Sequence, residues 1–289
     1  NKTYLGVMLG PRKVPGASLV SWIPGLRRTV RTEAPVERID RLRRIVGVLR
    51  EQLRDYHPRS LGFIQRGRIL FDERAEAICF AMTGYWRPVP LTLSGPRAMF
   101  SETFIVGHEA FEVRMPHASA WGACLNMHDF PYQTGPGMFD RFLSASYRHT
   151  VYHGFRCLTP TDGEALATRK QNKMRQAGDR ALTQAAELTQ AADMIAGNRM
   201  MMGQYGFALT VFVDDRVRLT EAVQKAWGDL SYGGMKVERA SVALEAMLFS
   251  MIPGNFHLRG QEAGVSSRNF AAFAAMHNFP AGEERGFWG

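Results

Sequence analysis

Residues 207–213 read Phe-Ala-Leu-Thr-Val-Phe-Val, and this stretch decides the predicted fold. A continuous run of apolar and β-branched residues is typical of a strand that is buried on both faces. Beyond it, the apolar spacing predicts a helix over residues 219–230, a strand over 235–239 and a helix over 241–251 that ends before Pro253. Parallel strands joined by a helix would form a small sheet with its helices on one face.

The first quarter of the chain predicts the same order of elements. Residues 3–10 and 61–65 have the composition of strands, and residues 72–83 predict a helix that closes at Gly84. Between the two strands, apolar residues recur at helical spacing and define one apolar stripe: Val36, Ile39, Leu42, Ile45, Val46, Leu49, Leu53 and Tyr56. The two ends of the chain therefore predict two related β-α-β-α units.

The middle of the chain predicts a strand meander followed by a short helix and one more strand. These elements occupy residues 104–106, 110–115, 121–126, 138–144 and 150–157.

Residues 161–197 form a long polar segment without proline. Four apolar residues recur every seven positions along it: Met174, Ala181, Leu188 and Ile195. This spacing indicates a narrow seam of the coiled-coil type, and Thr161 or Asp162 would cap the start of the helix. Two interpretations stay open, a helix or helical hairpin that packs on the body of the protein and a seam between two molecules.

The sequence thus predicts an α+β fold, with two β-α-β-α units with mixed sheets, a central strand meander and a long polar helical segment. Five segments follow from it. They are 1–90, the first unit with its basic helix; 91–160, the meander with a helix and a strand; 161–198, the long helix or helical hairpin; 199–252, the second unit; and 253–289, an extended aromatic strap.

The formal net charge of +9 arises mostly in the first quarter of the chain. Residues 27–68 hold twelve arginines against five acidic residues. Several of these arginines lie largely off the apolar stripe and form a candidate basic patch: Arg38, Arg41, Arg44, Arg50 and Arg54. A solvated face, an acidic protein or anionic lipid headgroups would each account for the patch. Nucleic acid is a weaker interpretation, because few aromatic residues lie among the arginines.

Sequence motifs for catalysis and for metal binding are missing. The chain has no GxxxxGK[ST], GxGxxG, HExxH or GxSxG pattern. His149 and His153 would share one face of a helix as zinc ligands, but their neighbours predict a strand, on which they would lie roughly 13 Å apart. Cys79, Cys124 and Cys157 are widely spaced, which indicates buried reduced thiols in a cytoplasmic protein.

Membrane-spanning and export segments are not expected. No apolar stretch reaches the roughly 20 residues that a transmembrane helix needs. The first thirty residues lack the pattern of a signal peptide.

The last fifty residues carry the most specific motifs. In chain order they are Val242-Ala243-Leu244-Glu245-Ala246, Met251-Ile252-Pro253-Gly254-Asn255-Phe256, Ser266-Ser267-Arg268-Asn269-Phe270-Ala271-Ala272, Met276-His277-Asn278-Phe279-Pro280 and Phe287-Trp288-Gly289. Upstream motifs complete the series: Tyr4 to Pro11, Gly84-Tyr85-Trp86-Arg87-Pro88-Val89-Pro90, Gly137 to Leu143, Ala177-Gly178-Asp179, Gly203 and Leu209-Thr210-Val211. Together they resemble the VirB-type inner-membrane assembly ATPases of conjugative transfer and type IV secretion systems.

The resemblance implies that the catalytic site lies outside these residues. In this family, ATP and magnesium bind a RecA-like motor domain that follows the Trp-Gly pair, here Trp288 and Gly289. The resemblance therefore implies a non-catalytic amino-terminal docking and oligomerisation region of a motor that powers pilus assembly and substrate transfer. No catalytic, cofactor-binding or metal-binding residue is expected in it.

The resemblance also implies partners and a location. The expected partners are further copies of the chain in a hexamer, the inner-membrane subunits of the secretion system and its other ATPases. The expected location is peripheral, on the cytoplasmic face of the bacterial inner membrane, with contact to the membrane surface and without direct binding of nucleic acid. A freestanding nucleic-acid-binding α+β module is the alternative function.

The aromatic strap is the candidate contact with the motor domain or a partner. Its candidate contact residues are Asn255, Phe256, Arg268, Asn269, Phe270, His277, Asn278, Phe279 and Trp288. Large aromatic side chains in a polar stretch usually bury against something. Packing within the same domain is the alternative interpretation.

Overall fold

The computed structural model describes residues 5–8, 34–93, 101–129, 131, 134–176, 194–195, 197, 199–255, 258 and 262–273. The chain divides into two compact units. One combines residues 1–60 with 277–289, and the other comprises residues 61–276. Within the described parts, no helix is both long and apolar enough to span a bilayer.

In the first unit, the predicted basic helix is confirmed as α1 (Pro35–Gln52), which starts with proline at its first position and has no buried residue. The short 3-10 helix η1 (Arg54–Tyr56) follows and ends at His57, which has a positive φ of 47°. The strand predicted at residues 3–10 is not found at residues 5–8, which have no regular secondary structure. The other residues of that stretch lie outside the described part.

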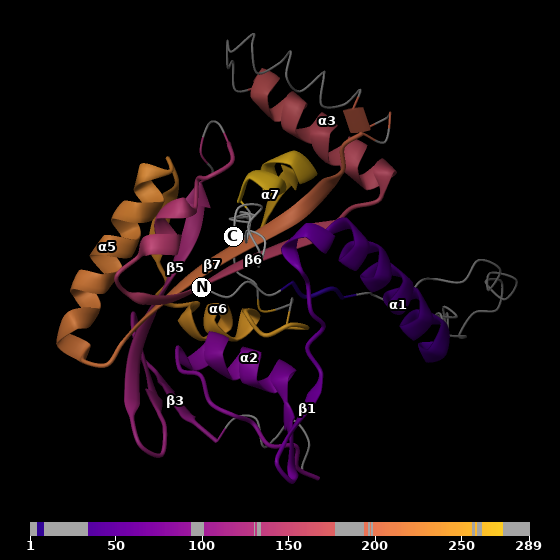
Figure 1. The fold of residues 1–289 in the computed structure, drawn as a ribbon. Coiled ribbons are helices and arrows are strands. Elements are labelled where there is room, and N and C mark those ends of the chain that lie inside the picture. The colour runs from indigo at the N-terminus through magenta and orange to yellow at the C-terminus, as the bar shows by residue number, and fades with distance from the viewer. Residues whose placement is uncertain are drawn as a thin grey trace, which may run out of the picture. The chain divides into compact units, whose positions relative to one another are not determined.

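The second unit is built around a seven-stranded sheet (Figure 1). Its strands are β3 (Thr103–Val106), β4 (Phe111–Arg114), β5 (Ser119–Asp129), β6 (Arg148–Cys157), β7 (Met202–Val213), β8 (Lys236–Arg239) and β9 (Ala263–Ser266). Strand β7 pairs with β6 along one edge, while β5 and β9 pair with successive parts of its other edge. Strands β4 and β8 in turn share the outer edge of β5.

The α+β class and the central meander are confirmed, but the expected parallel pairing is wrong. Every strand pair among the described residues is antiparallel. Strands β7 and β8 do run in the same direction on either side of α5 (Leu219–Tyr232), yet β5 lies between them and pairs with both. The sequence predicted β5, β7 and β8 as strands, but it did not predict that β5 lies between the other two.

The predicted first β-α-β-α unit is corrected in the same way. The strand expected at residues 61–65 is β1 (Phe63–Arg66), and it pairs antiparallel with β2 (Ile69–Asp72). Two residues separate the strands, and Gly67 has a φ of +64°. Glycine supplies this conformation at little cost, so the chain forms a tight hairpin and needs no crossover helix.

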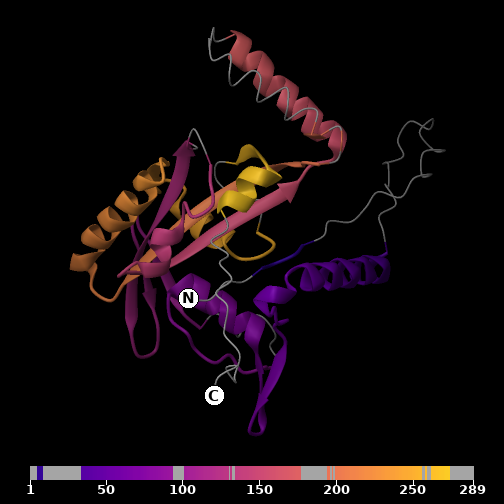
Figure 2. The ribbon, with the colours of Figure 1, turned by 45° about the horizontal axis from the view of Figure 1, so that its top comes forward.

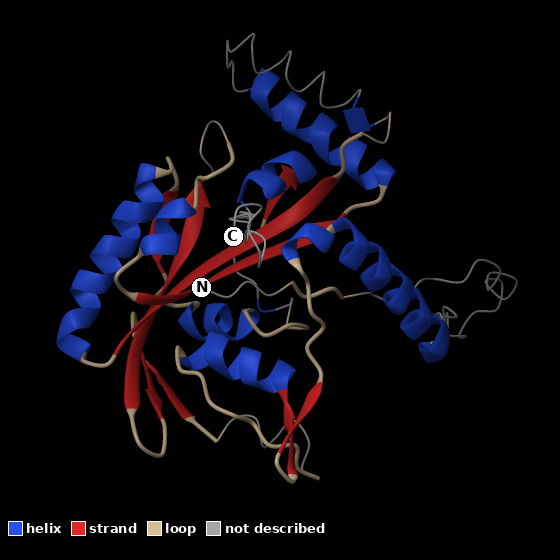
Figure 3. Ribbon diagram, in the orientation of Figure 1, coloured by secondary structure: helices blue, strands red, loops and turns tan. Residues whose placement is uncertain are grey.

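Helices cover both faces of the large sheet, not one face as expected (Figure 3). Alternate residues of β7 point to opposite sides. Leu209 and Val211 join a core with α5, the 3-10 helix η3 (Asp140–Ser144) and α7 (Ser267–Phe273). Ala208 and Phe212 join a second core with two further helices, α2 (Glu73–Thr83) and α6 (Leu244–Ser250).

The end of α2 at Gly84 is as predicted, whereas Asp72, expected as the first residue of the helix, precedes it as the cap. The Asp72 side chain accepts hydrogen bonds from the backbone of Arg74 and Ala75, and Gly84 closes the helix with a φ of +71°. The helix predicted at residues 138–144 is the shorter η3, and the helix predicted at 241–251 is α6. Between β7 and α5 lies one more 3-10 turn, η4 (Arg216–Arg218).

The long polar segment begins with α3 (Pro160–Gln176). Its cap is neither Thr161 nor Asp162 but Thr159, whose hydroxyl accepts a hydrogen bond from the backbone of Asp162 at 3.2 Å and donates one to its carboxylate at 2.7 Å. Proline at position 160 makes Thr159 the last residue before the helix, which sequence spacing alone did not resolve.

Only one residue of the predicted heptad seam has a described side chain. Ile195 is buried against Ala167 of α3 and Met202 of β7. At this position the seam therefore packs within the chain. The side chain of Met174 is not described, and Ala181 and Leu188 lie outside the described residues.

We expect Gly84→Ala to destabilise the second unit by about 2 kcal/mol. Gly84 has a positive φ, and a Cβ atom there would lie 2.7 Å from Cγ of Phe212. Gly47→Ala in α1 is the control, because nothing lies within 4 Å of its Cβ position. Alanine should strengthen that helix by up to about 1 kcal/mol. Chemical denaturation followed by near-ultraviolet circular dichroism measures both, and equal stabilities of Gly84→Ala and the parent would contradict the packing described.

Candidate functional site

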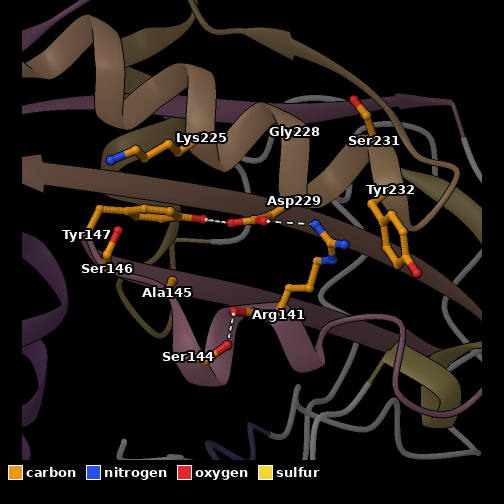
Figure 4. A pocket seen from close by; sticks show the side chains of 10 residues that line it. All are labelled: Arg141, Ser144, Ala145, Ser146, Tyr147, Lys225, Gly228, Asp229, Ser231 and Tyr232. Carbon is orange, nitrogen blue, oxygen red and sulfur yellow. Dashed lines mark hydrogen bonds and ion pairs between the residues drawn. The ribbon is translucent and has the colours of Figure 1, made fainter.

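A polar hollow of about 830 Å³ lies between η3 and α5 (Figure 4). Its lining residues are Arg141, Ser144, Ala145, Ser146, Tyr147, Lys225, Gly228, Asp229, Ser231 and Tyr232. The two positively charged side chains, Arg141 and Lys225, come from different elements. Of these residues, only Arg141 falls within a sequence motif, the stretch from Gly137 to Leu143.

Asp229 organises the interior of the hollow. The Tyr147 hydroxyl donates a hydrogen bond to Asp229 at 2.7 Å, and the Arg141 guanidinium lies 3.6 Å from the same carboxylate. Arg141 also lies over the Tyr232 ring, 3.5 Å from its centre. Burial and the neighbouring Asp229 together raise the pKa of Tyr147. The Asp229 carboxylate is thus held by two partners from the other side of the hollow.

The histidine pair lies on a strand, as the neighbouring residues predict. His149 and His153 lie on β6, and Nδ1 of His153 is 2.8 Å from the hydroxyl of Tyr205. Burial lowers the pKa of His153 to about 4 and also lowers that of His149. Within the described residues no group of three potential metal ligands comes together. His153 is partly buried beside Phe139, Tyr205 and Phe207, and its lowered pKa keeps it neutral near pH 7.

The cysteines are free thiols, as expected, but not all are buried. Cys79 and Cys124 are buried, and burial raises their pKa values to about 11 and about 12. Cys157 is exposed at the end of β6, which corrects that part of the expectation.

The Ser-Ser-Arg-Asn-Phe motif is a helix start. Ser266 precedes α7, and its hydroxyl accepts a hydrogen bond from the backbone of Asn269 at 3.1 Å, while Oδ1 of Asn269 accepts one from the backbone of Ser266 at 3.2 Å. This reciprocal pair is a capping box. Asn269 also donates to the Thr134 hydroxyl at 2.8 Å. Arg268 is exposed.

The aromatic residues of this motif pack within the second unit. Phe270 stacks on Phe155 of β6, with ring centres 4.7 Å apart. Phe273 is fully buried and lies 5.0 Å from the ring of Tyr205. Residues 263–273 of the expected extended strap therefore form a strand and a helix, because their aromatic side chains have a core to enter.

The remaining strap candidates divide into two groups. Nδ2 of Asn255 donates to the carbonyl oxygen of Phe249 at 3.2 Å, just beyond α6. Phe256, His277, Asn278, Phe279 and Trp288 lie outside the described residues. Their proposed contacts with a motor domain or partner stay predictions.

The candidate basic patch lies on α1 and η1, with Arg54 on the latter. Val36, Ile39 and Val48 are exposed on the same helix, with exposed fractions of 68%, 49% and 58%. Two ion pairs with local acidic residues are formed, Arg43 with Asp40 and Arg54 with Glu51. The helix therefore carries both positive charge and apolar surface.

The β1–β2 hairpin carries an exposed apolar surface that was not predicted from the sequence. Phe63, Ile64, Ile69 and Leu70 are all exposed large apolar residues. The signal was present in the stretch from Phe63 to Phe71, where apolar residues flank a two-residue turn that contains glycine.

A sequence model of the CagE, TrbE, VirB family, a component of the type IV transporter system, matches residues 59–260. Protein virB4 of Rhizobium radiobacter is 32% identical over 243 residues, which cover 84% of this chain and 31% of that protein. Type IV secretion system protein virB4 of Bartonella henselae is 30% identical over 293 residues, 100% of this chain and 37% of that protein. The chain thus spans about a third of the length of these relatives.

A more distant relative fits the same pattern. Type IV secretion system protein PtlC of Bordetella pertussis is 27% identical over 213 residues, 73% of this chain and 26% of that protein. Because the family model covers more than half of the chain, the chain belongs to the CagE, TrbE, VirB family of type IV transporter components. The resemblance found in the sequence motifs is confirmed.

We expect His153 to make the stability of the second unit depend on pH. Its pKa is about 4 in the folded chain, below the model-peptide value of about 6.5, so the unfolded chain binds the proton first as the pH falls. The free energy of unfolding should fall by about 2 kcal/mol between pH 6.5 and 4.5 from this residue alone, and level off below pH 4. His153→Gln should show a shallower fall, with the part due to His149 retained. Identical slopes in variant and parent would contradict a neutral His153.

We expect Asn269→Ala to lower the free energy of unfolding by about 1 to 2 kcal/mol, because it removes one side of the capping box and the hydrogen bond to Thr134. Arg268→Ala is the matched control on the neighbouring exposed residue and should change stability by less than about 0.5 kcal/mol. Thermal and denaturant unfolding of the chain measure both. A neutral Asn269→Ala would instead favour a role of this residue outside the domain.

Proposed function

We propose that the chain is a non-catalytic docking and oligomerisation region of a type IV secretion ATPase that powers pilus assembly and substrate transfer. Its proposed place is peripheral, on the cytoplasmic face of the bacterial inner membrane. Its partners would be further copies of itself, with a hexamer as the proposed state, together with inner-membrane subunits and other ATPases of the secretion system. ATP and magnesium would bind to the motor domain of the full-length protein.

The observation that carries the docking part is the surface of α1. No residue of this helix is buried, and its arginines are arranged around the apolar stripe. Arg38 lies one turn from Leu42, Arg41 one turn from Ile45, and Arg50 one turn from Val46. Arginine at the border of an apolar face is typical of helices that lie in the plane of a membrane interface.

The acidic residues of α1 favour the same orientation. Glu37 and Glu51 each lie two turns from Arg44, and Asp40 lies one turn from it, so these charges share one face. That face is the one away from most of the apolar stripe. An anionic lipid surface would therefore meet apolar side chains and arginine while the carboxylates point to water.

We expect the chain to bind vesicles that contain phosphatidylglycerol and phosphatidylethanolamine, and to bind phosphatidylcholine vesicles much less. Arg50→Gln should weaken binding about five-fold, since each basic residue near an anionic surface contributes about 1 kcal/mol. Arg44→Gln removes the same charge from the other face of the helix and should change binding less than about two-fold. Co-sedimentation at physiological ionic strength measures the affinities.

The outcomes separate docking from other uses of the patch. Equal losses for Arg44→Gln and Arg50→Gln would indicate a diffuse charge effect and contradict the proposed orientation. Failure of the parent chain to bind anionic vesicles would remove the membrane part of the proposal. Salt-dependent binding to DNA that depends on Arg50 would favour the nucleic-acid-binding alternative.

A further inference from the structure

The β1–β2 hairpin projects away from the large sheet (Figures 1 and 2). It carries exposed apolar side chains on both of its faces. The exposed fractions are 56% for Phe63, 37% for Ile64, 52% for Ile69 and 46% for Leu70. Strand register puts Ile64 and Ile69 on one face and Phe63 and Leu70 on the other. All four residues of β1 are exposed. Apolar surface of this kind usually marks an interaction site.

The hairpin is held firmly at its base. The guanidinium of Arg66 makes two hydrogen bonds to the buried carboxylate of Glu76, at 2.7 and 3.0 Å, and lies 4.9 Å from the centre of the Phe71 ring. The backbone of Gly62 is also bonded to Glu73 in both directions. The exposed strand is therefore a fixed surface, and a partner would meet it with little loss of conformational entropy.

The hydrogen bonds of β2 show which backbone amide and carbonyl groups of β1 point away from β2 and have no partner within the hairpin. The carbonyl oxygen of Leu70 accepts a bond from Leu91, and the amide of Asp72 donates to Val89, so these residues face away from β1. Residues 69 and 71 then face β1 and pair with Arg66 and Ile64. Because orientation alternates along a strand, the amide and carbonyl groups of Phe63 and Gln65 point outward from the free edge of β1.

An open strand edge calls for a protein strand more than for lipid. Lipid would cover the apolar side chains but leave the four outward backbone groups without partners, at a cost of several kcal/mol each in hydrocarbon. An extended protein segment satisfies both requirements at once, since it pairs with the edge and packs on the side chains. Among the described residues, no backbone hydrogen bond to this edge is made by another segment.

We propose that β1 pairs antiparallel with β1 of a second copy of this chain, around a two-fold axis at Ile64. The proposal deepens the self-association proposed above and rests on it. In this register, Phe63 exchanges both backbone hydrogen bonds with Gln65 of the partner subunit, and Gln65 does the same with Phe63 of the partner subunit. Four hydrogen bonds form, all from groups that point outward in the single chain.

This register also suits the side chains. Ile64 lies beside Ile64 of the partner subunit. Since Ile64 is paired with Phe71 within its own hairpin, the two hairpins share one apolar row across a four-stranded sheet. The arginines do not oppose each other, because Arg66 and Arg66 of the partner subunit are four positions apart along the strands, roughly 13 Å. In a register centred on Gln65, Phe63 would have to pair with Gly67 of the partner subunit. Gly67 has a φ of +64°, which differs from the extended conformation of a paired strand residue. The axis at Ile64 uses strand residues only.

The test is a symmetric cross-link in the 289-residue chain. Exposed Cys157 is first replaced by serine, and Ile64→Cys is then introduced. Directly opposite residues of this kind have Cα atoms about 4.5 Å apart, within the range that a disulfide spans. Mild oxidation should yield a covalent dimer, at least about five-fold more than Gln65→Cys yields, because residues 65 of the two copies would be roughly 7–8 Å apart.

A proline variant tests the backbone hydrogen bonds separately. The amide of Gln65 points away from β2, so Gln65→Pro should leave the hairpin intact while removing two of the four bonds between copies. In the Ile64→Cys background it should reduce the cross-link at least about five-fold. Circular dichroism and the unfolding midpoint verify that the chain remains folded.

Three results would overturn the proposal in distinct ways. Self-association without a cross-link at Ile64→Cys would leave oligomerisation standing and exclude the β1 edge. A strictly monomeric chain at all concentrations would reject both self-association and this contact. Binding to anionic vesicles that is lost in Phe63→Ser and Leu70→Ser, without cross-linking, would assign the hairpin to a lipid surface.

Discussion

The backbone pairing of β7 is the constraint on which the second unit depends. This strand is hydrogen-bonded to three others, and its residues are nearly all buried. Its alternate side chains enter two separate cores, with Leu209 in one and Phe212 in the other. Because each core has its own helices, the positions of α5 and α7 are set by one face of β7 and those of α2 and α6 by the other.

Two glycines, Gly203 at the start of β7 and Gly84 beside it, leave the space that phenylalanine rings occupy. A Cβ atom on Gly203 would lie 2.3 Å from the ring of Phe155, and one on Gly84 would lie 2.7 Å from Phe212. Phe155 in turn stacks on Phe270 of α7. The capping box at Ser266 therefore places an aromatic residue against a strand more than a hundred positions earlier in the chain, and a local motif fixes a long-range contact.

Local pattern was sufficient to find most elements and insufficient to pair them. The run at residues 207–213 was recognised because a strand buried on both faces needs continuous apolar residues. Its actual partners, β5, β6 and β9, could not be chosen from sequence, because strand pairing depends on contacts between distant segments. Strand β9 was missed because Ala263 and Gly264 have weak strand propensity, and it forms only because β7 offers a free edge.

The candidate site residues also differ in whether a local sequence pattern reveals them. Asn269 was predicted as a contact of the strap, and in the structure its side chain caps α7 and binds Thr134. Its spacing from Ser266 was the better clue to this role, since serine followed three positions later by a side-chain acceptor is a helix start. The hollow around Asp229 had no local signal, because Tyr147 and Arg141 meet it only after the sheet brings η3 and α5 together. Groups of polar residues that are close in the sequence can therefore be predicted from it. Groups that come together only through the fold can be predicted only where a known motif marks them.

The exposed elements are those that the cores do not need. No residue of α1 is buried and β1 is exposed throughout, so neither is constrained by packing in the way that β7 is. Their sequences nevertheless keep large apolar residues beside arginine. One of these arginines, Arg66, forms an ion pair with the buried Glu76. Such a pair adds little stability compared with two apolar residues in the same place, but it fixes the direction in which the strand leaves the body of the unit. A device that fixes the direction of an exposed strand is useful when something must meet that strand in one register.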